Sequence, residues 1–516
     1  METMELTTIV RAGAVARPDA VAVSCYDRSQ TYAELHERAC RLANALGDLG
    51  IQRGERVATL SGNCLEIVEQ MTGIASGAYV RTSLYAHSSA ESNLYLLNLT
   101  GASALIVEAA LYPAIAPHLP DAELLRHVLV FGGDAPEGTI SYEAALAAAS
   151  VENPGTVLAD DDPHVIRFSS GTTGKPKGIL HTVARWCAVA REMALLMPPL
   201  DEKDSYLAAG PLAHAALLPL FGVLAAGGRI VIMPAFDPAR FVELVQREHA
   251  TITLLVPTMI QMITALPQAQ TADLSSLRAV FYGAAPISER TLADGRATWG
   301  DVMYQMYGQS EAVPLTVLTP ADHVGRRLRS AGRPTPNTVI RIVDENGNDV
   351  PAGQVGEIAA RTPAAMAAIW RDEAASAQRF LPDGAVLTRD MGYLDEDGLL
   401  YLADRKEDMI ISGGYNIWPA ELENALAAHP AVAEVAVVGV PHEKWGETPT
   451  AVVVLRPGQR ASEEELIDWT RAKVGAVKRV TSVEFSDALP KSPLGKVLRR
   501  EVKKRYWDST TAIAGA

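Results

Sequence analysis

The chain has 516 residues, of which 48% are hydrophobic and 21% charged, which is typical of a globular protein and too long for a single core. Its formal net charge of −15 argues against nucleic acid or an anionic membrane surface as the main partner. The cysteines lack metal-ligand spacing, the N-terminus lacks an apolar signal core, and the apolar stretches are too short for a bilayer. We therefore expect a cytoplasmic enzyme without a membrane span.

Strand and helix patterns alternate along the N-terminal part of the chain. Thr31 and Glu34 predict a capping box that opens a helix running to about Leu49. The later segments that we expect are strands at 56–60, 229–233, 252–256 and 278–282, and helices at 65–74, 237–249 and from Pro257. This alternation predicts parallel sheets covered by helices, with ligand sites at the carboxyl ends of the strands.

The pattern changes after about residue 339 to short strands separated by turns, which continue to about residue 402. A charged cluster at 404–408 then precedes a unit with strands at 435–440 and 451–455 and a helix at 463–473. We expect an α/β protein with a large N-terminal domain (1–404), a hinge (405–408) and a small, mobile α+β C-terminal domain (409–516). The large domain should hold two doubly wound α/β subdomains and a small β-rich one.

A loop rich in glycine, hydroxyl and lysine residues follows the apolar strand that contains Val165 and Ile166. Glycines let the backbone approach a phosphate, hydroxyls and N–H groups donate hydrogen bonds, and lysines neutralise charge. The P-loop pattern G-x-x-x-x-G-K-[ST] does not fit, because Pro176 follows Lys175. The alternative is a flexible surface loop, but the interleaved lysines favour phosphate binding. The expected phosphate ligands are Ser169, Ser170, Gly171, Thr172, Thr173, Gly174, Lys175 and Lys177.

This loop resembles the signature of the adenylate-forming superfamily, which contains acyl- and aryl-CoA ligases, nonribosomal adenylation domains and beetle luciferases. A second stretch, Tyr307-Gly308-Gln309-Ser310-Glu311, resembles the family's Y-G-x-[TS]-E element. The resemblance implies that Glu311 assists Mg²⁺, Ser310 contacts the α-phosphate of ATP and Tyr307 packs on adenine. Gly283, Ala284 and Ala285 resemble the strand end beside the adenine.

The segment 388–392 resembles the family's T-G-D-x-G, which implies that Asp390 and Arg405 hold the ribose. Arg389 stands where glycine is usual, and Ala368 departs from a nearby G-Y-W pattern. His214 lies in a segment that resembles the one orienting the substrate carboxylate, although a lone histidine in an apolar run is more often a core residue. The family members that activate amino acids place an aspartate in this region, so the resemblance, with alanine and leucine neighbours here, implies a plain carboxylic acid over an amino acid.

The C-terminal residues resemble the elements that the family uses in both half-reactions. Lys496 matches the family's catalytic lysine, and Glu407 matches the pivot of the hinge. The positions similar to those lining a pantetheine tunnel are Gly413, Gly414, Tyr415 and Trp445. The resemblance thus implies an ATP-dependent acid–CoA ligase, an acid–thiol ligase that forms an acyl-adenylate and then a thioester with release of AMP. Its cofactors would be ATP, Mg²⁺ and CoA.

Several alternatives stay open. The chain could load a carrier protein, could be specialised for one half-reaction because of Arg389 and Ala368, or could be a nucleotide-binding regulator, which would not need Lys496. The acid could be fatty, aromatic or polycyclic, and a homodimer is undecided. Small residues either leave room for a large acid or only pack closely: Ala215, Ala216, Ala284, Ala285, Ala312 and Val313.

Overall fold

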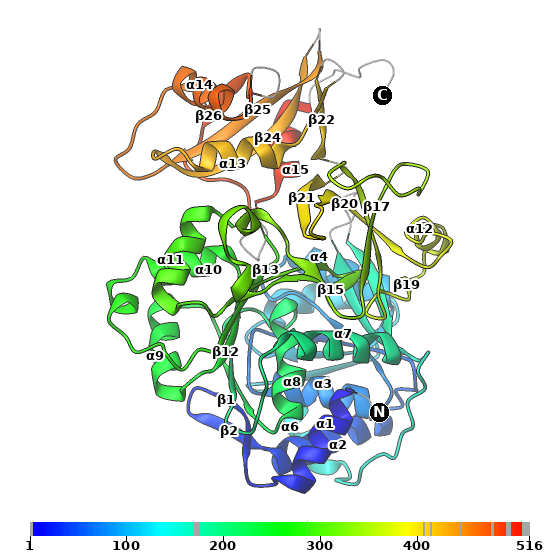
Figure 1. Ribbon diagram of the computed structural model, residues 1–516. Coiled ribbons are helices and arrows are strands. Elements are labelled where there is room, and N and C mark those ends of the chain that lie inside the picture. Colours follow the sequence, from blue (N-terminus) through cyan, green and yellow to red (C-terminus); the bar gives the residue numbers. More distant parts are fainter. Residues whose placement is uncertain are drawn as a thin grey trace. The chain divides into compact units, whose positions relative to one another are not determined.

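The computed structural model describes residues 4–169, 176–285, 287–405, 408–412, 415–442, 445–475, 479–491 and 497–507 (Figure 1). The chain divides into two compact units. The first comprises Met1–Ala284, Ala293–Ile340 and Ala360–Val386, and the second Ala285–Leu292, Arg341–Ala359 and Leu387–Ala516. The boundaries that we expect at 404 and 409 stay predictions.

The first unit is built on two mixed sheets. In the described residues, one sheet has the strand order β16 (Arg333–Pro334), β15 (Ala312–Leu318), β14 (Met303–Gln309), β13 (Ala279–Gly283), β12 (Ile252–Leu255), β10 (Ser205–Ala208), β11 (Arg229–Ile232), β1 (Val21–Cys25), β2 (Arg28–Thr31). The other has the order β19 (Ala368–Ile369), β9 (Lys177–Thr182), β8 (Pro163–Ser169), β4 (Val80–Ser83), β3 (Arg56–Leu60), β5 (Ala102–Glu108), β6 (His127–Phe131), β7 (Ile140–Ser141).

The centres of both sheets are parallel, as the alternation predicts, and several edge strands are antiparallel. β12 pairs in parallel with β13, and β3 with β4 and β5, whereas β8 pairs antiparallel with β9, and β14 with β15. These two antiparallel hairpins each carry one of the signature sequences.

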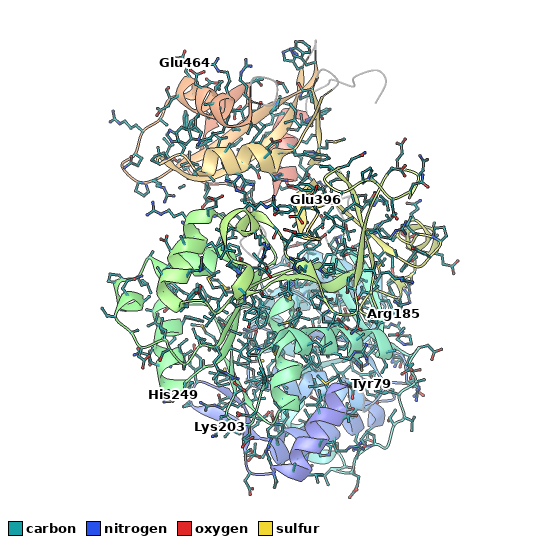
Figure 2. The ribbon with its side chains drawn as sticks, in the orientation of Figure 1. Tyr79, Arg185, Lys203, His249, Glu396 and Glu464 are labelled. Atoms are coloured by element: carbon teal, nitrogen blue, oxygen red, sulfur yellow. The ribbon has the colours of Figure 1, made fainter. Side chains whose placement is uncertain are left out.

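Helices cover the sheets of the first unit. They are α1 (Leu6–Ala16), α2 (Tyr32–Asp48), α3 (Glu66–Ser76), α4 (Ala90–Thr100), α5 (Tyr112–Ile115), α6 (Tyr142–Ala148), α7 (Val183–Leu196), α8 (Leu218–Ala225), α9 (Pro238–Glu248), α10 (Pro257–Thr264), α11 (Glu289–Trp299), which continues from the second unit, and α12 (Glu373–Ala377). Figure 1 shows α9 and α10 on one face of the sheet containing β12, with α7 and α8 on the other. Side chains fill the space between these layers (Figure 2).

The predicted capping box is confirmed at the start of α2. The Glu34 N–H donates to Thr31 Oγ1 at 3.2 Å, and the Thr31 N–H donates to Glu34 Oε2 at 2.8 Å. Two of the four N–H groups left without helical partners are thereby satisfied. The apolar face of α2 then packs into the core through Leu35, Leu42 and Leu46, which are all buried.

The second unit holds two smaller sheets. Its described strands are β17 (Val339–Val343), β18 (Gly356–Arg361), β20 (Val386–Leu394) and β21 (Leu400–Arg405) in one sheet, and β23 (Tyr415–Ile417), β22 (Ile410–Ser412), β25 (Gly446–Leu455), β24 (Val432–His442) and β26 (Ser482–Phe485) in the other. β17 and β20 begin in the first unit, and β18 ends in it. The remaining helices are α13 (Pro419–Ala427), α14 (Glu463–Val474) and α15 (Arg499–Trp507).

The predicted C-terminal strands are longer than expected, because β24 and β25 form one long antiparallel pair from Val432↔Leu455 to His442↔Gly446. None of the described helices combines the length and the apolar composition that are needed to cross a membrane.

Candidate active site

The phosphate-loop sequence connects β8 to β9. Ser169 ends β8 and is opposite Lys177, the first residue of β9. The loop residues Ser170, Gly171, Thr172, Thr173, Gly174 and Lys175 lie outside the described residues. Just after the loop, the Trp370 N–H donates to the Gly178 carbonyl at 2.7 Å, and a Cβ at Gly178 would lie 3.0 Å from the Trp370 Cβ. The Ala368-Ile369-Trp370 segment therefore packs against β9, the strand that follows the loop in the sequence.

The turn Ser310–Glu311 lies at the end of β8. Ser310 Oγ donates to the Phe168 carbonyl at 3.2 Å, and His181 Nε2 donates to the Ser310 carbonyl at 2.9 Å. Burial, and next the charge of Arg167, lowers the pKa of His181 to about 3, so this imidazole is a neutral donor at pH 7. These contacts bring the two signature sequences together, although they are more than a hundred residues apart in the chain.

The residues expected beside the adenine also meet. β13 and β14 are parallel, with Gly283 opposite Met306. A Cβ at Gly283 would lie 2.2 Å from the Met306 carbonyl oxygen, so only glycine fits between these backbones. Ala284 follows with a φ of 64°, and Tyr307, Gly308 and Gln309 lie within β14. These three residues complete a strand, and Ser310 and Glu311 form the turn that follows it.

Glu311 is 6% exposed and forms an ion pair with Arg379. Arg379 Nη1 donates to Glu311 Oε1 at 3.3 Å, and its Nη2 donates to Gln309 Oε1 at 3.2 Å. The backbone of Glu311 is fixed as well, because its carbonyl accepts from the Met366 N–H at 2.6 Å. Sequence reasoning missed Arg379, since no local pattern relates it to the hairpin.

His214 stacks on Tyr85, with ring centroids 4.5 Å apart and an interplanar angle of 16°. Burial first, and then the charge of Arg167, lowers the pKa of His214 to about 4. A cavity of about 20 Å³ is lined by His214, Tyr85, Ser310, Arg167, Arg81 and Ser83, with apolar residues completing its wall. His214 and Ser310 therefore face one small space, and they share it with two arginines that sequence reasoning missed. An arginine between Ile166 and Phe168, inside an apolar strand, was the available signal.

The residues expected at the ribose lie in the second unit. Asp390 on β20 is directly opposite Arg405 on β21. Arg389 has a φ of 66°, a left-handed conformation that favours glycine, and its N–H donates to Glu357 Oε1 at 3.2 Å. The departure from the family pattern thus falls at a position where the backbone itself calls for glycine.

The predicted catalytic lysine, hinge pivot and CoA-binding residues lie in the C-terminal part of the chain. Lys496, Glu407, Gly413 and Gly414 lie outside the described residues. The backbone of Tyr415 belongs to β23 and pairs with Ser412. Trp445 is 46% exposed, and its backbone N–H donates to His442 Nδ1 at 3.3 Å.

Comparison with known proteins identifies the family. The model of the AMP-binding enzyme family matches residues 10–370, and that of the AMP-binding enzyme C-terminal domain matches residues 421–496. The chain is 34% identical to the medium/long-chain-fatty-acid–CoA ligase FadD8 of Mycobacterium tuberculosis, over 95% of this chain and 88% of that protein. It is 36% identical to the feruloyl-CoA synthase of an Amycolatopsis species, over 95% of this chain and 96% of that protein.

A solved structure has the same fold. ATP-bound MatB from Rhodopseudomonas palustris superposes with a TM-score of 0.89 at 27% identity, covering 98% of this chain and 99% of that one. The chain therefore belongs to the AMP-binding enzymes of the adenylate-forming superfamily.

Proposed function

We propose that this protein is an ATP-dependent acid–CoA ligase, which activates a carboxylic acid as an acyl-adenylate and then transfers the acyl group to CoA with release of AMP. The observation that carries the proposal is the contact between Ser310 Oγ and the Phe168 carbonyl, at 3.2 Å. The phosphate loop begins two residues after Phe168, so this contact supports a single polyphosphate site shared by the loop, Ser310 and Glu311.

In the first step, a carboxylate oxygen attacks the α-phosphorus of ATP and pyrophosphate leaves. The loop hydroxyls, Lys175 and Lys177 would offset the phosphate charge, and Ser310 would donate to the α-phosphate. His214 is neutral at pH 7, because its pKa is lowered to about 4, and would therefore orient the carboxylate as a hydrogen-bond donor without adding charge. Lys496 would contact both the carboxylate and the α-phosphate as negative charge develops between them.

The residues around Glu311 fit a magnesium ion bound together with ATP. A buried carboxylate stands beside the hydroxyl of Ser310 at a hairpin turn, and the described residues contain no cluster of three or more acidic, histidine or cysteine ligands. Mg²⁺ usually takes one or two carboxylates and completes its shell with substrate phosphates and water. When bound, the ion would neutralise charge on the polyphosphate.

In the second step, the CoA thiol attacks the acyl carbonyl and AMP leaves. We assign the pantetheine tunnel to Gly413, Gly414, Tyr415 and Trp445, the ribose contacts to Asp390 and Arg405, and the pivot of domain rotation to Glu407. FadD8 and feruloyl-CoA synthase are both named for CoA and for different acids, which supports CoA as the acceptor and leaves fatty and aryl acids as candidates. A cytoplasmic location, a carrier protein as alternative acceptor and a homodimer remain parts of the proposal to be tested.

The experiment is a panel of fatty, aryl and polycyclic acids with Mg-ATP, assayed for pyrophosphate and AMP with and without CoA. We expect one acid class to yield pyrophosphate, and acyl-CoA plus AMP only when CoA is present. Synthetic acyl-adenylates supplied with CoA, or with a phosphopantetheinylated carrier protein, test the second step alone. The proposal would be contradicted if no acid released pyrophosphate and no acyl-adenylate yielded a thioester.

The role of Lys496 is tested with Lys496→Ala. Removal of a contact that stabilises transition-state charge typically costs about 10²- to 10³-fold in rate. We expect that loss in pyrophosphate release, and Lys491→Ala is the matched control, because Lys491 forms an exposed ion pair with Glu434 at 2.7 Å. Unchanged adenylate formation by Lys496→Ala would remove this lysine from the mechanism.

A further inference from the structure

Two arginines of neighbouring strands lie on the same face of their sheet. β4 and β8 are parallel with Arg81 opposite Val165, and side chains alternate along a strand, so Arg167 shares the face of Arg81. The two guanidinium carbons lie 5.9 Å and 5.8 Å from the ring centroid of Trp186 on α7. The indole thus holds two cationic groups beside the cavity that also contains His214 and Ser310.

The described residues do not balance this charge. Arg81 is 6% exposed and donates to Ser83 Oγ at 3.1 Å, a neutral acceptor. Arg167 Nη1 is buried and has no hydrogen-bond partner among the described residues. None of the carboxylates described lies within 4.0 Å of either guanidinium. Two positive groups are therefore held close together without an anion.

Two carboxylates of this region have partners other than the two arginines. Glu311, which acts on Arg167 through its charge, pairs with Arg379 at 3.3 Å. Glu5 caps α1 by accepting the Thr7 N–H at 2.7 Å and the Thr8 N–H at 3.3 Å. Burial, and next the charge of Arg167, lowers the pKa of Arg81 to about 10. The surroundings of Arg81 therefore disfavour its charged form. An uncompensated buried charge is expensive enough that a bound anion is the natural partner.

We propose that the cavity between Arg81 and Arg167, which we call the arginine cavity, binds a carboxylate group of the acid substrate. Its volume of about 20 Å³ is small, so its occupant would be a small polar group and not an acyl chain. A planar guanidinium matches a carboxylate in two parallel hydrogen bonds. The inference rests on the proposed function, and the carboxylate has two sources: the reacting group, since His214 and Ser310 line the cavity, or the second acid group of a dicarboxylic acid.

The kinetic test compares acids that differ only by a second carboxylate, hexanoate with adipate and cinnamate with 4-carboxycinnamate. A hydrogen bond to a buried charged group contributes enough that Arg167→Met or Arg81→Met should raise KM for the acid by about 10- to 100-fold, with KM for ATP unchanged. An equal rise for both members of a pair assigns the reacting carboxylate, and a rise confined to the diacid assigns the second one. Arg167→Lys should recover part of the affinity, and Arg191→Met, an exposed arginine of α7, is the matched control.

A binding measurement separates this proposal from the proposed function. Acetate or adipate, added without ATP, should raise the Tm of the wild-type protein and of Arg191→Met more than that of Arg167→Met, because a ligand stabilises the folded state that binds it. If no acid is turned over but this difference appears, the ligase assignment fails and the anion site stands. Equal Tm shifts in all variants, together with unchanged KM values for both acid types in a folded Arg167→Met protein, would overturn the arginine cavity as a carboxylate site.

Discussion

Arg379 pairs with the carboxylate that we assign to Mg²⁺, so its removal should make that carboxylate more available to the ion. The two side chains are 13% and 7% exposed, and their charged atoms are 3.3 Å apart. Coulomb's law at an effective dielectric constant of about 20 gives an attraction of about 5 kcal/mol. Loss of one partner from a buried pair costs about 3–5 kcal/mol, because the other charge remains without compensation.

We therefore expect Arg379→Met to be less stable than the wild type by about 3 kcal/mol without Mg-ATP. A bound cation would restore the balance at Glu311. Since every 1.4 kcal/mol is about tenfold in affinity, recovery of that much alone would lower the half-saturating Mg²⁺ concentration about tenfold.

The assay is pyrophosphate release as a function of free Mg²⁺ at saturating ATP, paired with urea unfolding in the absence of both. Arg379→Lys keeps the charge and should behave like the wild type. Arg185→Met is the matched control, because Arg185 donates to a carbonyl, that of Ala365 at 3.1 Å, and not to a carboxylate (labelled in Figure 2). A half-saturating Mg²⁺ concentration that rises or stays constant in Arg379→Met would refute the reasoning that Glu311 exchanges an arginine for a metal.

Three further predictions concern the positions around the site. Arg389→Gly should be more stable than Arg389→Ala by about 1 kcal/mol in urea unfolding, since both lack the side chain and only glycine accepts a φ of 66° without strain; equal midpoints would contradict this. Gly283→Ala should lose about 1–3 kcal/mol and weaken ATP binding in calorimetry, because its Cβ meets a backbone oxygen at 2.2 Å, whereas in Gly295→Ala the nearest atom is the flexible Met303 Sδ at 3.0 Å and little change is expected. The pKa of His181 is lowered to about 3 in the folded protein from 6.5 in the unfolded chain. Between these pH values the unfolded chain binds a proton that the folded protein does not. The free energy of unfolding should therefore fall as pH drops from 6.5 to 3, by up to about 1.4 kcal/mol per pH unit. Urea midpoints measured across this range should depend less on pH in His181→Gln, and an unchanged slope would exclude this histidine as a source of acid sensitivity.

Most of the fold could be predicted from local sequence patterns. The capping box of α2 needs only Thr31 and Glu34, and the buried strand β13 is a continuous apolar run, so both could be read from neighbouring residues. The signature sequences could likewise be recognised, because each is a short continuous segment, but the antiparallel pairing of β8 with β9 and of β14 with β15 was not predicted. Arg389 could be recognised as unusual before its backbone conformation was known.

The partners of the site residues could not be predicted in this way. Arg379 reaches Glu311 across 68 positions of the chain, and Ser310 reaches Phe168 across 142. Such contacts depend on how strands are ordered in a sheet, and that order is not encoded in any local period. The two arginines beside Trp186 belong to the same class, since their proximity follows from the pairing of β4 with β8.

The pairing of the N-terminal hairpin has a consequence for synthesis on the ribosome. β1 pairs with β11, Val23 opposite Ile230, and the Tyr32 hydroxyl donates to the carbonyl of Gly228 at 2.6 Å. The first strand to be translated must therefore wait for its neighbour until a large part of the chain has emerged, while the sheet formed by β3, β4 and β5 can assemble earlier from adjacent segments. A nascent chain stalled before β11 would expose an unpaired strand edge, and we expect it to depend on chaperones during that interval.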